Sequence, residues 1–368
     1  MIYFLLLIIG IFLTVLRIDS VAIQNVYALI CIIAITFYIA TVSPLHSYDT
    51  IAYQLYYTLP PITHRFEIGY MELSYFFFTH GCSYQFFRFV MTLCFQFLMF
   101  LGVRKFTNNL VLFYVLYMIF PFFIDSGQVR FNYMFCLVLF ALGFLKKFNI
   151  KSVVLSICLI IISSLFQVSG LVYLLVPLLY LVQLKKLLRF TDVLLIVFAF
   201  IAIVMRILPL NNLVGNLLTM AMQISGRSGA DHYVELYSQG SSMSVIIFYI
   251  LSLVFTYILF RKYLVDISKS TSENVQKILL ATFLVGILFI PALIASGDFE
   301  RFMRCSIVIF SIVVSIYLDP SLHRTIENTI KHLLIIFALY AFITFSWRYW
   351  TEDGGMIQFL PYIIHMYS

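Results

Sequence analysis

The chain has 368 residues, of which 63% are hydrophobic and 11% are charged, and its formal net charge is +7. A water-soluble domain of this length could not bury so much apolar surface, so we expect a protein that crosses a membrane many times. The positive charge does not indicate nucleic-acid binding, because no basic domain and no RNA- or DNA-binding motif accompanies it.

Apolar runs near the length of a bilayer-spanning helix follow one another along the chain, which predicts an all-α polytopic protein with about 12 transmembrane helices. These helices, in a single integral membrane domain over 1–368, are expected at 1–16, 26–42, 85–101, 110–124, 131–145, 152–168, 170–184, 192–206, 244–260, 278–295, 303–318 and 332–347. The short pair that meets near Gln167–Gly170 could be a tight outer turn or a broken helix. The first run is not expected to be a cleaved signal peptide, since Leu16-Arg17-Ile18-Asp19 is a poor cleavage site.

The lysine positions orient the predicted helices. All ten lysines, together with five arginines, lie in short loops at every second interval between helices. Because cytoplasmic loops are enriched in Lys and Arg, this side is predicted to face the cytoplasm. The remaining eight arginines are then expected on the outer side or within the membrane.

Three segments are expected outside the membrane, of which the third is the C-terminal tail from about Trp347. Residues 43–84 form an aromatic outer loop, in which the part from Phe66 to Phe78 could be an interfacial or re-entrant helix. Residues 207–243 are glycine-containing and polar, which predicts a mobile outer loop around Arg227 and His232. Long loops without secondary structure of their own are usually functional or disordered.

Two shorter outer turns, 125–130 and 296–304, run directly into helices. Arg130 and Arg304 are therefore expected at or just below the membrane surface, and Arg88 occupies a similar position on the third helix. A guanidinium group binds phosphate oxygens in a bidentate manner, so an outer arginine cluster suits a lipid-linked pyrophosphate. The alternative is that these arginines extend to the interface or pair with acids such as Glu300.

Several short motifs resemble the EpsG-like family of membrane proteins. Tyr48-Asp49 with Tyr53, followed by Phe66-Glu67-Ile68-Gly69-Tyr70, is similar to the D…Y…E-x-G-Y stretch of that family. Gln128-Val129-Arg130-Phe131 and Glu300-Arg301-Phe302 look like its arginine-bearing helix start and its late outer turn. Phe166-Gln167-Val168-Ser169-Gly170 falls where the family tends to carry F-H-x-S-A, so the family's histidine cannot be the base in this chain.

The resemblance implies a Wzy-type polysaccharide polymerase, such as an O-antigen polymerase, with a GT-C-like glycosyltransferase architecture and long periplasmic loops. Such an enzyme of the bacterial inner membrane transfers a growing glycan from undecaprenyl pyrophosphate to a lipid-linked repeat unit on the periplasmic face. The expected partners are undecaprenyl-pyrophosphate-linked oligosaccharide and membrane lipid, with a chain-length regulator protein as a further candidate and no nucleic acid. No cofactor is expected, and the lack of a paired D-x-D motif or histidine cluster predicts metal independence.

The implied reaction needs a general base and a group that stabilises the departing pyrophosphate. The candidate catalytic carboxylates are Asp49, Glu67 and Glu300. Pyrophosphate binding is assigned to Arg130, Arg301, Arg304, Arg227, Arg65 and Arg88. Further candidates are His232 and Asp298 as bases, and Tyr53 and Tyr70 as platforms for sugar rings. The tyrosines also fit an interfacial aromatic belt.

Three other functions compete with polymerisation. A flippase for lipid-linked oligosaccharide predicts charged residues at helix centres and an internal two-fold repeat, and neither is evident in the sequence. An O-antigen ligase would share the arginine cluster and a long outer loop, so the sequence does not separate it from a polymerase. An outer-face acyltransferase would need a His/Asp dyad that is not evident.

Overall fold

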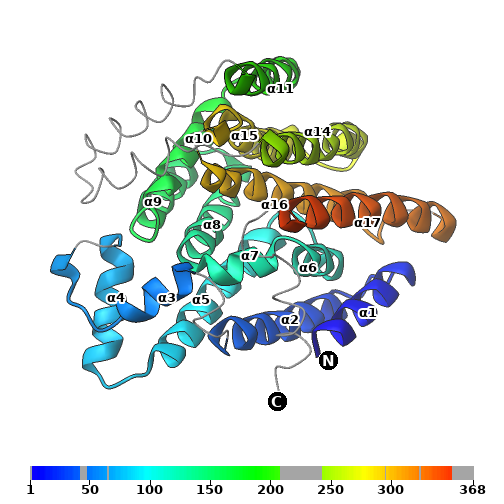
Figure 1. Ribbon diagram of the computed structural model, residues 1–368. Helices are drawn as coiled ribbons and strands as arrows, with labels where there is room; N and C mark the ends of the chain where they lie inside the picture. Colours follow the sequence, from blue (N-terminus) through cyan, green and yellow to red (C-terminus); the bar gives the residue numbers. More distant parts are fainter. Residues whose placement is uncertain are drawn as a thin grey trace.

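The structure is a computed structural model that describes residues 2–41, 48–63, 66–207, 243–294, 296–322 and 325–349. The regular secondary structure in these ranges is helical, and the long helices pack side by side in a bundle (Figure 1). Seven of the described helices are long and apolar enough to cross a membrane. The expected all-α polytopic membrane protein is therefore confirmed.

The N-terminal half of the chain contains α1 (Ile2–Val15), α2 (Val21–Thr41), α3 (Tyr48–Leu55), η2 (Pro61–Thr63), α4 (Ile68–Thr79), α5 (Tyr84–Arg104), α6 (Leu110–Ile119), α7 (Phe122–Gly127), α8 (Val129–Leu142), η3 (Leu145–Lys147), α9 (Ile150–Ser163), η4 (Val168–Leu174) and α10 (Leu175–Leu179). The C-terminal half contains α11 (Leu184–Ile207), α14 (Met243–Asp266), η5 (Ile267–Lys269), α15 (Glu273–Leu288), η6 (Pro291–Ile294), η7 (Gly297–Phe299), α16 (Glu300–Tyr317) and α17 (Ile326–Tyr349). The elements labelled η are short 3₁₀-helices.

The expectation of about twelve spans is not supported, because only seven described helices meet the length and hydropathy of a span. Each predicted run overlaps a helical element, but some of these elements are short or broken. The predicted helix at 110–124 is divided between α6 and α7 at Pro121, which has no backbone N–H to continue a helix. The predicted helix at 170–184 is η4 followed by α10, so a turn rather than a continuous span lies near Gln167.

Helices α8 and α16 occupy the centre of the bundle, and almost all of their side chains are buried. α8 packs against α5 and α9, whereas α16 packs against α15, α14 and α6. Each central helix carries a buried arginine near its N-terminal end, Arg130 in α8 and Arg304 in α16. The two arginines expected at the membrane surface are therefore enclosed by other helices of the protein.

Two glycines allow the central helices to approach their neighbours closely. A Cβ atom at Gly102 of α5 would lie 2.8 Å from the backbone of Leu139 in α8. A Cβ atom at Gly286 of α15 would lie 2.8 Å from the carbonyl oxygen of Phe302 in α16. Small residues serve this purpose in membrane helix bundles, where close backbone contact adds van der Waals attraction.

The predicted cytoplasmic loops gather at one end of the bundle. Arg17, after α1, donates a hydrogen bond to the carbonyl oxygen of Pro320 beyond α16 (2.8 Å). Asn274 of α15 donates to the carbonyl oxygen of Lys146 (3.2 Å), and Lys146 in turn donates to the carbonyl oxygen of Lys105. These contacts join the connection after α1 to the one after α16, and the connections after α5 and α8 to each other and to the start of α15. The orientation of these connections toward the cytoplasm stays a prediction.

Candidate functional site

A second group of charged side chains lies at the opposite end of the bundle. Arg88 is near the start of α5 and Arg104 is its last residue, and a rise of 1.5 Å per residue separates them by about 24 Å along the helix. We name this second group the outer charge cluster. Its charged members come from α3, α5, α7, α8, η7, α16 and the residue before α4, and the neutral Gln128 between α7 and α8 bonds to them: Asp49, Glu67, Arg88, Asp125, Gln128, Arg130, Asp298, Glu300, Arg301 and Arg304.

Arg304 is the most extensively bonded member of the outer charge cluster, and its side chain is only 1% exposed. Its Nη1 donates to Oδ1 of Asp125 (3.0 Å), and its Nε lies 3.0 Å from Oε2 of Glu300. Its Nη2 donates to Oε1 of Gln128. Two carboxylates therefore neutralise this guanidinium and fix its plane between α7 and α16.

Asp125 is held in place from its other side as well. Tyr117 of α6 donates to Oδ2 (3.1 Å), and Asn132 of α8 donates to the same oxygen (3.2 Å). Gln96 of α5 donates to the side-chain oxygen of Asn132 (3.0 Å) and so extends the network. Because both oxygens of Asp125 accept hydrogen bonds within the protein, this carboxylate acts as a positioning group for Arg304.

Arg130 is paired with Glu67, which precedes the first turn of α4. The other carboxylate oxygen of Glu67 accepts a hydrogen bond from the backbone N–H of Val168 (3.2 Å). The backbone N–H of Tyr70 donates to the carbonyl oxygen of Leu165 (3.2 Å). Glu67 and Tyr70 therefore attach α4 to both α8 and the connection between α9 and η4.

Three aromatic rings enclose the guanidinium of Arg130. Its central carbon lies 4.2 Å from the ring centre of Phe66, 5.2 Å from that of Tyr53 and 6.0 Å from that of Tyr70. Burial raises the pKa of Tyr53, with a further contribution from Asp49. Burial also raises the pKa of Tyr70 well above its usual value. Both tyrosines thus stay protonated, and they serve as walls of an arginine cage rather than as exposed platforms for sugars.

Arg301 is the accessible arginine of the outer charge cluster among those that the structure describes. Its side chain is 21% exposed, and its Nη2 lies 3.1 Å from Oδ1 of Asp298 and 3.9 Å from Oδ2 of Asp49. The carboxylates are more open still, with exposures of 57% and 38% respectively. This group, named the Arg301 mouth, brings α3, η7 and α16 together where substrate could reach it.

Arg88 is buried as deeply as Arg304 but has a different set of contacts. Its Nη2 donates to the carbonyl oxygen of Ser126 (3.2 Å), and its guanidinium lies 5.6 Å from the ring centre of Tyr84. Within the described ranges, no carboxylate forms an ion pair with it, and its Nε has no hydrogen-bond partner. A buried cation of this kind is costly unless an anion neutralises it.

The structure thus brings together most of the predicted site residues, but it gives them different roles. The three candidate carboxylates differ, because Glu67 and Glu300 are each paired with a buried arginine and Asp49 is open. Arg65, Arg227 and His232 lie outside the described residues, as does most of the loop at 207–243. The helix expected between Phe66 and Phe78 is present as α4, while its interfacial position stays a prediction.

Two functional candidates, Asp125 and Gln128, were missed as site residues from the sequence. The segment containing them was expected to be a turn at the surface, but Asp125 lies in helix α7 and is 6% exposed. The available signal in the sequence was the position of Asp125, an acidic residue that directly follows a long apolar run and lies five positions before Arg130. Among the described residues, no group of three or more His, Cys, Asp or Glu side chains is arranged to hold a metal ion.

Residues 26–364 match the model of the EpsG family, which covers almost the whole chain. No curated protein and no solved structure matches this chain, so its GT-C-like architecture stays a prediction. The matched region includes both the outer charge cluster and the motifs around Asp49, Glu67 and Arg130 from which the resemblance was inferred. The chain is a polytopic membrane protein that belongs to the EpsG family.

Proposed function

We propose that the protein is a surface-polysaccharide polymerase of the O-antigen type in the bacterial inner membrane. It would transfer a growing glycan from undecaprenyl pyrophosphate to a lipid-linked repeat unit on the periplasmic face. Membership of the EpsG family supports a polymerase-like role in polysaccharide synthesis. The observation that carries the proposal is the Arg301 mouth, where an accessible guanidinium lies 3.9 Å from the accessible carboxylate of Asp49.

The Arg301 mouth offers the two groups that glycosyl transfer requires. Asp49 accepts the proton of the acceptor sugar hydroxyl. The oxygen of that hydroxyl then bonds to the anomeric carbon of the donor. The bond from that carbon to the pyrophosphate breaks at the same centre, and the lipid pyrophosphate leaves with the bonding electrons. Arg301 stabilises the charge that develops on the leaving group.

The buried arginines have supporting roles in this proposal. Arg130 and Arg304 are already neutralised by carboxylates, so a pyrophosphate would have to displace Glu67 or Asp125 to reach them. They hold α4, α7 and α16 in position around the Arg301 mouth. Arg88 lacks a carboxylate partner among the described residues, so it can contribute uncompensated positive charge to the outer charge cluster.

Of the three candidate bases, Asp49 is favoured by its surroundings. Its carboxylate is 38% exposed and lies at the long distance of 3.9 Å from its arginine. Glu67 bonds to Arg130 and to the backbone of Val168, whereas Glu300 is 9% exposed beside Arg304. Asp298 is the second open carboxylate and has the shorter contact to Arg301.

Deletion of the gene, followed by gel analysis of surface polysaccharide, tests the proposal. A polymerase predicts loss of the ladder of chain lengths while a single repeat unit is still attached to the surface lipid. Complete loss of surface glycan would instead indicate the flippase or the ligase. Restoration of the ladder by the wild-type chain, and not by Asp49→Asn, connects the phenotype to the Arg301 mouth.

A further inference from the structure

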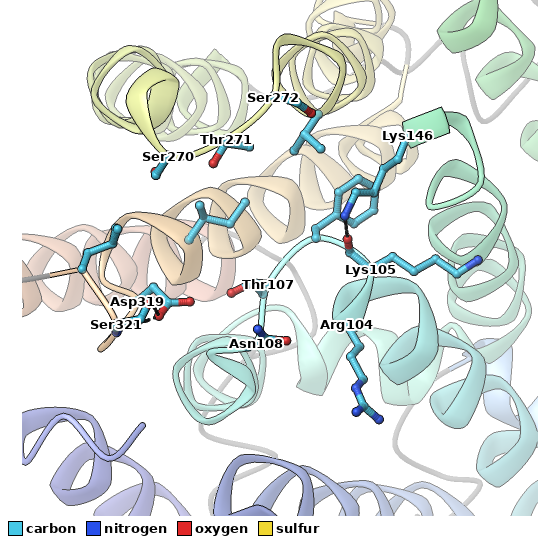
Figure 2. A pocket seen from close by; sticks show the side chains of 14 residues that line it. Arg104, Lys105, Thr107, Asn108, Lys146, Ser270, Thr271, Ser272, Asp319 and Ser321 are labelled. Carbon is cyan, nitrogen blue, oxygen red and sulfur yellow. Dashed lines mark hydrogen bonds between the residues drawn. The ribbon is translucent and has the colours of Figure 1, made fainter. Parts of the chain in front are cut away.

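A cavity of about 330 Å³ lies at the lysine-bearing end of the bundle, opposite the outer charge cluster. Four segments form its walls: the turn between α5 and α6, η3, the connection between α14 and α15, and the end of α16. Figure 2 shows hydroxyl and amide groups around it, from Thr107, Asn108, Ser270, Thr271 and Ser272. This lining suits a polar ligand rather than an acyl chain.

The charges at this cavity favour an anion. The lining has three basic residues, Arg104, Lys105 and Lys146, and one acidic residue, Asp319. The charged ends of Arg104 and Lys105 lie over neighbouring aromatic rings in α5 and in or just after α8, so they must turn to reach a ligand in the cavity. The Asp319 carboxylate is already engaged, because its Oδ1 accepts hydrogen bonds from the backbone N–H (2.9 Å) and the hydroxyl (2.6 Å) of Ser321. The negative charge is thereby bound within its own turn, and the cavity keeps an excess of positive charge.

The two lysines lie close together without a carboxylate between them. Lys146 donates to the backbone carbonyl of Lys105, and the Lys105 ammonium lies 3.0 Å from the ring centre of Phe144. Burial and, to a smaller extent, the charge of Lys146 together lower the pKa of Lys105 to about 8. Neither lysine forms an ion pair with an acidic side chain in the described ranges. An anion bound beside them would relieve this repulsion.

Helix α15 adds to the positive electrostatic potential at the cavity. It has 16 residues and begins directly after Ser272, whose side chain makes no hydrogen bond to the helix. The positive end of the helix dipole therefore lies at the cavity wall. Arg104 is exposed, and its side chain points away from the other labelled residues of the lining (Figure 2).

We propose that this cavity binds a phosphate group on the side of the protein opposite the polymerisation site. Phosphate oxygens accept hydrogen bonds from hydroxyl and amide groups and pair with lysine and arginine, which are the groups collected here. The phosphate can belong to the headgroup of an anionic phospholipid or to a small soluble phosphate compound. The site is independent of the chemistry assigned to the Arg301 mouth.

Binding is tested with the purified full-length protein in neutral detergent, by its melting temperature and by native mass spectrometry. The probes are inorganic phosphate, phosphatidylglycerol in mixed micelles, and phosphatidylcholine as the zwitterionic comparison. Wild-type protein is expected to be stabilised by phosphatidylglycerol more than by phosphatidylcholine, and to retain bound phosphatidylglycerol. Stabilisation by inorganic phosphate as well identifies a site open to soluble compounds, whereas no stabilisation by either anionic probe overturns the proposal.

The variants distinguish binding of the anionic probe in the cavity from its general attraction to the lysine-bearing surface. Lys146→Gln should require about tenfold more anionic probe for the same stabilisation. Lys151→Gln removes an exposed lysine of α9 on the same side, and it should change that concentration by less than about twofold. Asp319→Asn should bind the probe more tightly, which keeps the test informative if Lys146→Gln folds poorly. Equal weakening by Lys146→Gln and Lys151→Gln, or weaker binding by Asp319→Asn, contradicts the cavity as the site.

Discussion

Arg304 Nη1 lies 3.0 Å from Asp125 Oδ1, and this contact joins α16 to α7 across 179 positions of the chain. The arginine is 1% exposed and the aspartate 9% exposed as side chains, so the pair is shielded from solvent. Tyr117 and Asn132 complete the hydrogen bonding of Asp125. The pair therefore fixes the geometry of the outer charge cluster, and the accessible chemistry is left to the neighbouring Arg301.

Replacement of Asp125 by alanine should destabilise the protein. It leaves Arg304 with Glu300 as its remaining carboxylate and removes the acceptor for Tyr117 and Asn132. Loss of a buried hydrogen bond to a charged group costs about 2–3 kcal/mol. The measurement is the free energy of unfolding in mixed micelles, compared with Asp298→Ala. Because Asp298 is exposed, Asp298→Ala should change the free energy of unfolding by less than about 0.5 kcal/mol. Equal free energies for the two variants would show that Asp125 stabilises the protein no more than a surface residue.

Arg301 should tolerate substitution in folding but not in function. Arg301→Ala is expected to reach wild-type protein levels and a near-wild-type melting temperature while polysaccharide chains no longer lengthen. Arg301→Lys keeps the charge but loses the planar bidentate donor, so it should give shorter chains than wild type. Gel ladders and the level of the protein in the membrane, measured in the same cells, distinguish loss of function from loss of the protein. A full ladder with Arg301→Ala would remove this arginine from the reaction.

Glu67 should matter for the attachment of α4 rather than for proton transfer. Glu67→Ala leaves Arg130 buried without its carboxylate and the N–H of Val168 without its acceptor, which costs about 3 kcal/mol. Segment 48–79 should then be cleaved faster by a protease added to the outer face. The matched control is Glu72→Ala, since Glu72 is exposed on the same helix. Identical cleavage rates for Glu67→Ala and Glu72→Ala would argue against this attachment.

Lys105 should give the stability of the protein a specific pH dependence. Its pKa in the folded protein is about 8, below the ordinary value of 10.5. Between these two pH values the unfolded chain binds more protons than the folded one, so stability rises as the pH increases from 8 to 10.5. The melting temperature of wild type relative to Lys105→Met should rise over this interval. A constant difference between the two proteins would show that Lys105 titrates normally.

The sequence alone identified the helical membrane fold and the family, because apolar runs and short motifs depend on local composition. It did not identify the break at Pro121, where an apolar run of 15 residues from 110 to 124 was expected to be one helix. Because this break was missed, the burial of Asp125 in α7 was not predicted. The expected twelve spans are not supported among the described helices for a related reason, since hydropathy does not distinguish a span from a short helix buried among others.

The arginines illustrate what local sequence leaves undetermined. The separation of eight arginines from the lysines was predicted, and the structure places four of them, Arg88, Arg130, Arg301 and Arg304, at the opposite end from Lys105 and Lys146. Which of them is neutralised depends on contacts between distant segments, such as Arg130 with Glu67, separated by 63 positions. Accessibility distinguishes Arg301 from Arg304 although both lie within one turn of α16, and only tertiary packing decides it.

The most direct test of the proposed function is polymerisation by the purified protein. The wild-type protein is supplied with the lipid-linked repeat unit alone, and the products are resolved by gel electrophoresis and mass spectrometry. Glycans of two or more repeat units on one lipid, with release of undecaprenyl pyrophosphate and no product from Asp49→Asn, are expected. A repeat unit that stays monomeric with folded wild-type protein that restores the ladder in cells, or equal chain lengthening by Asp49→Asn, would contradict the account.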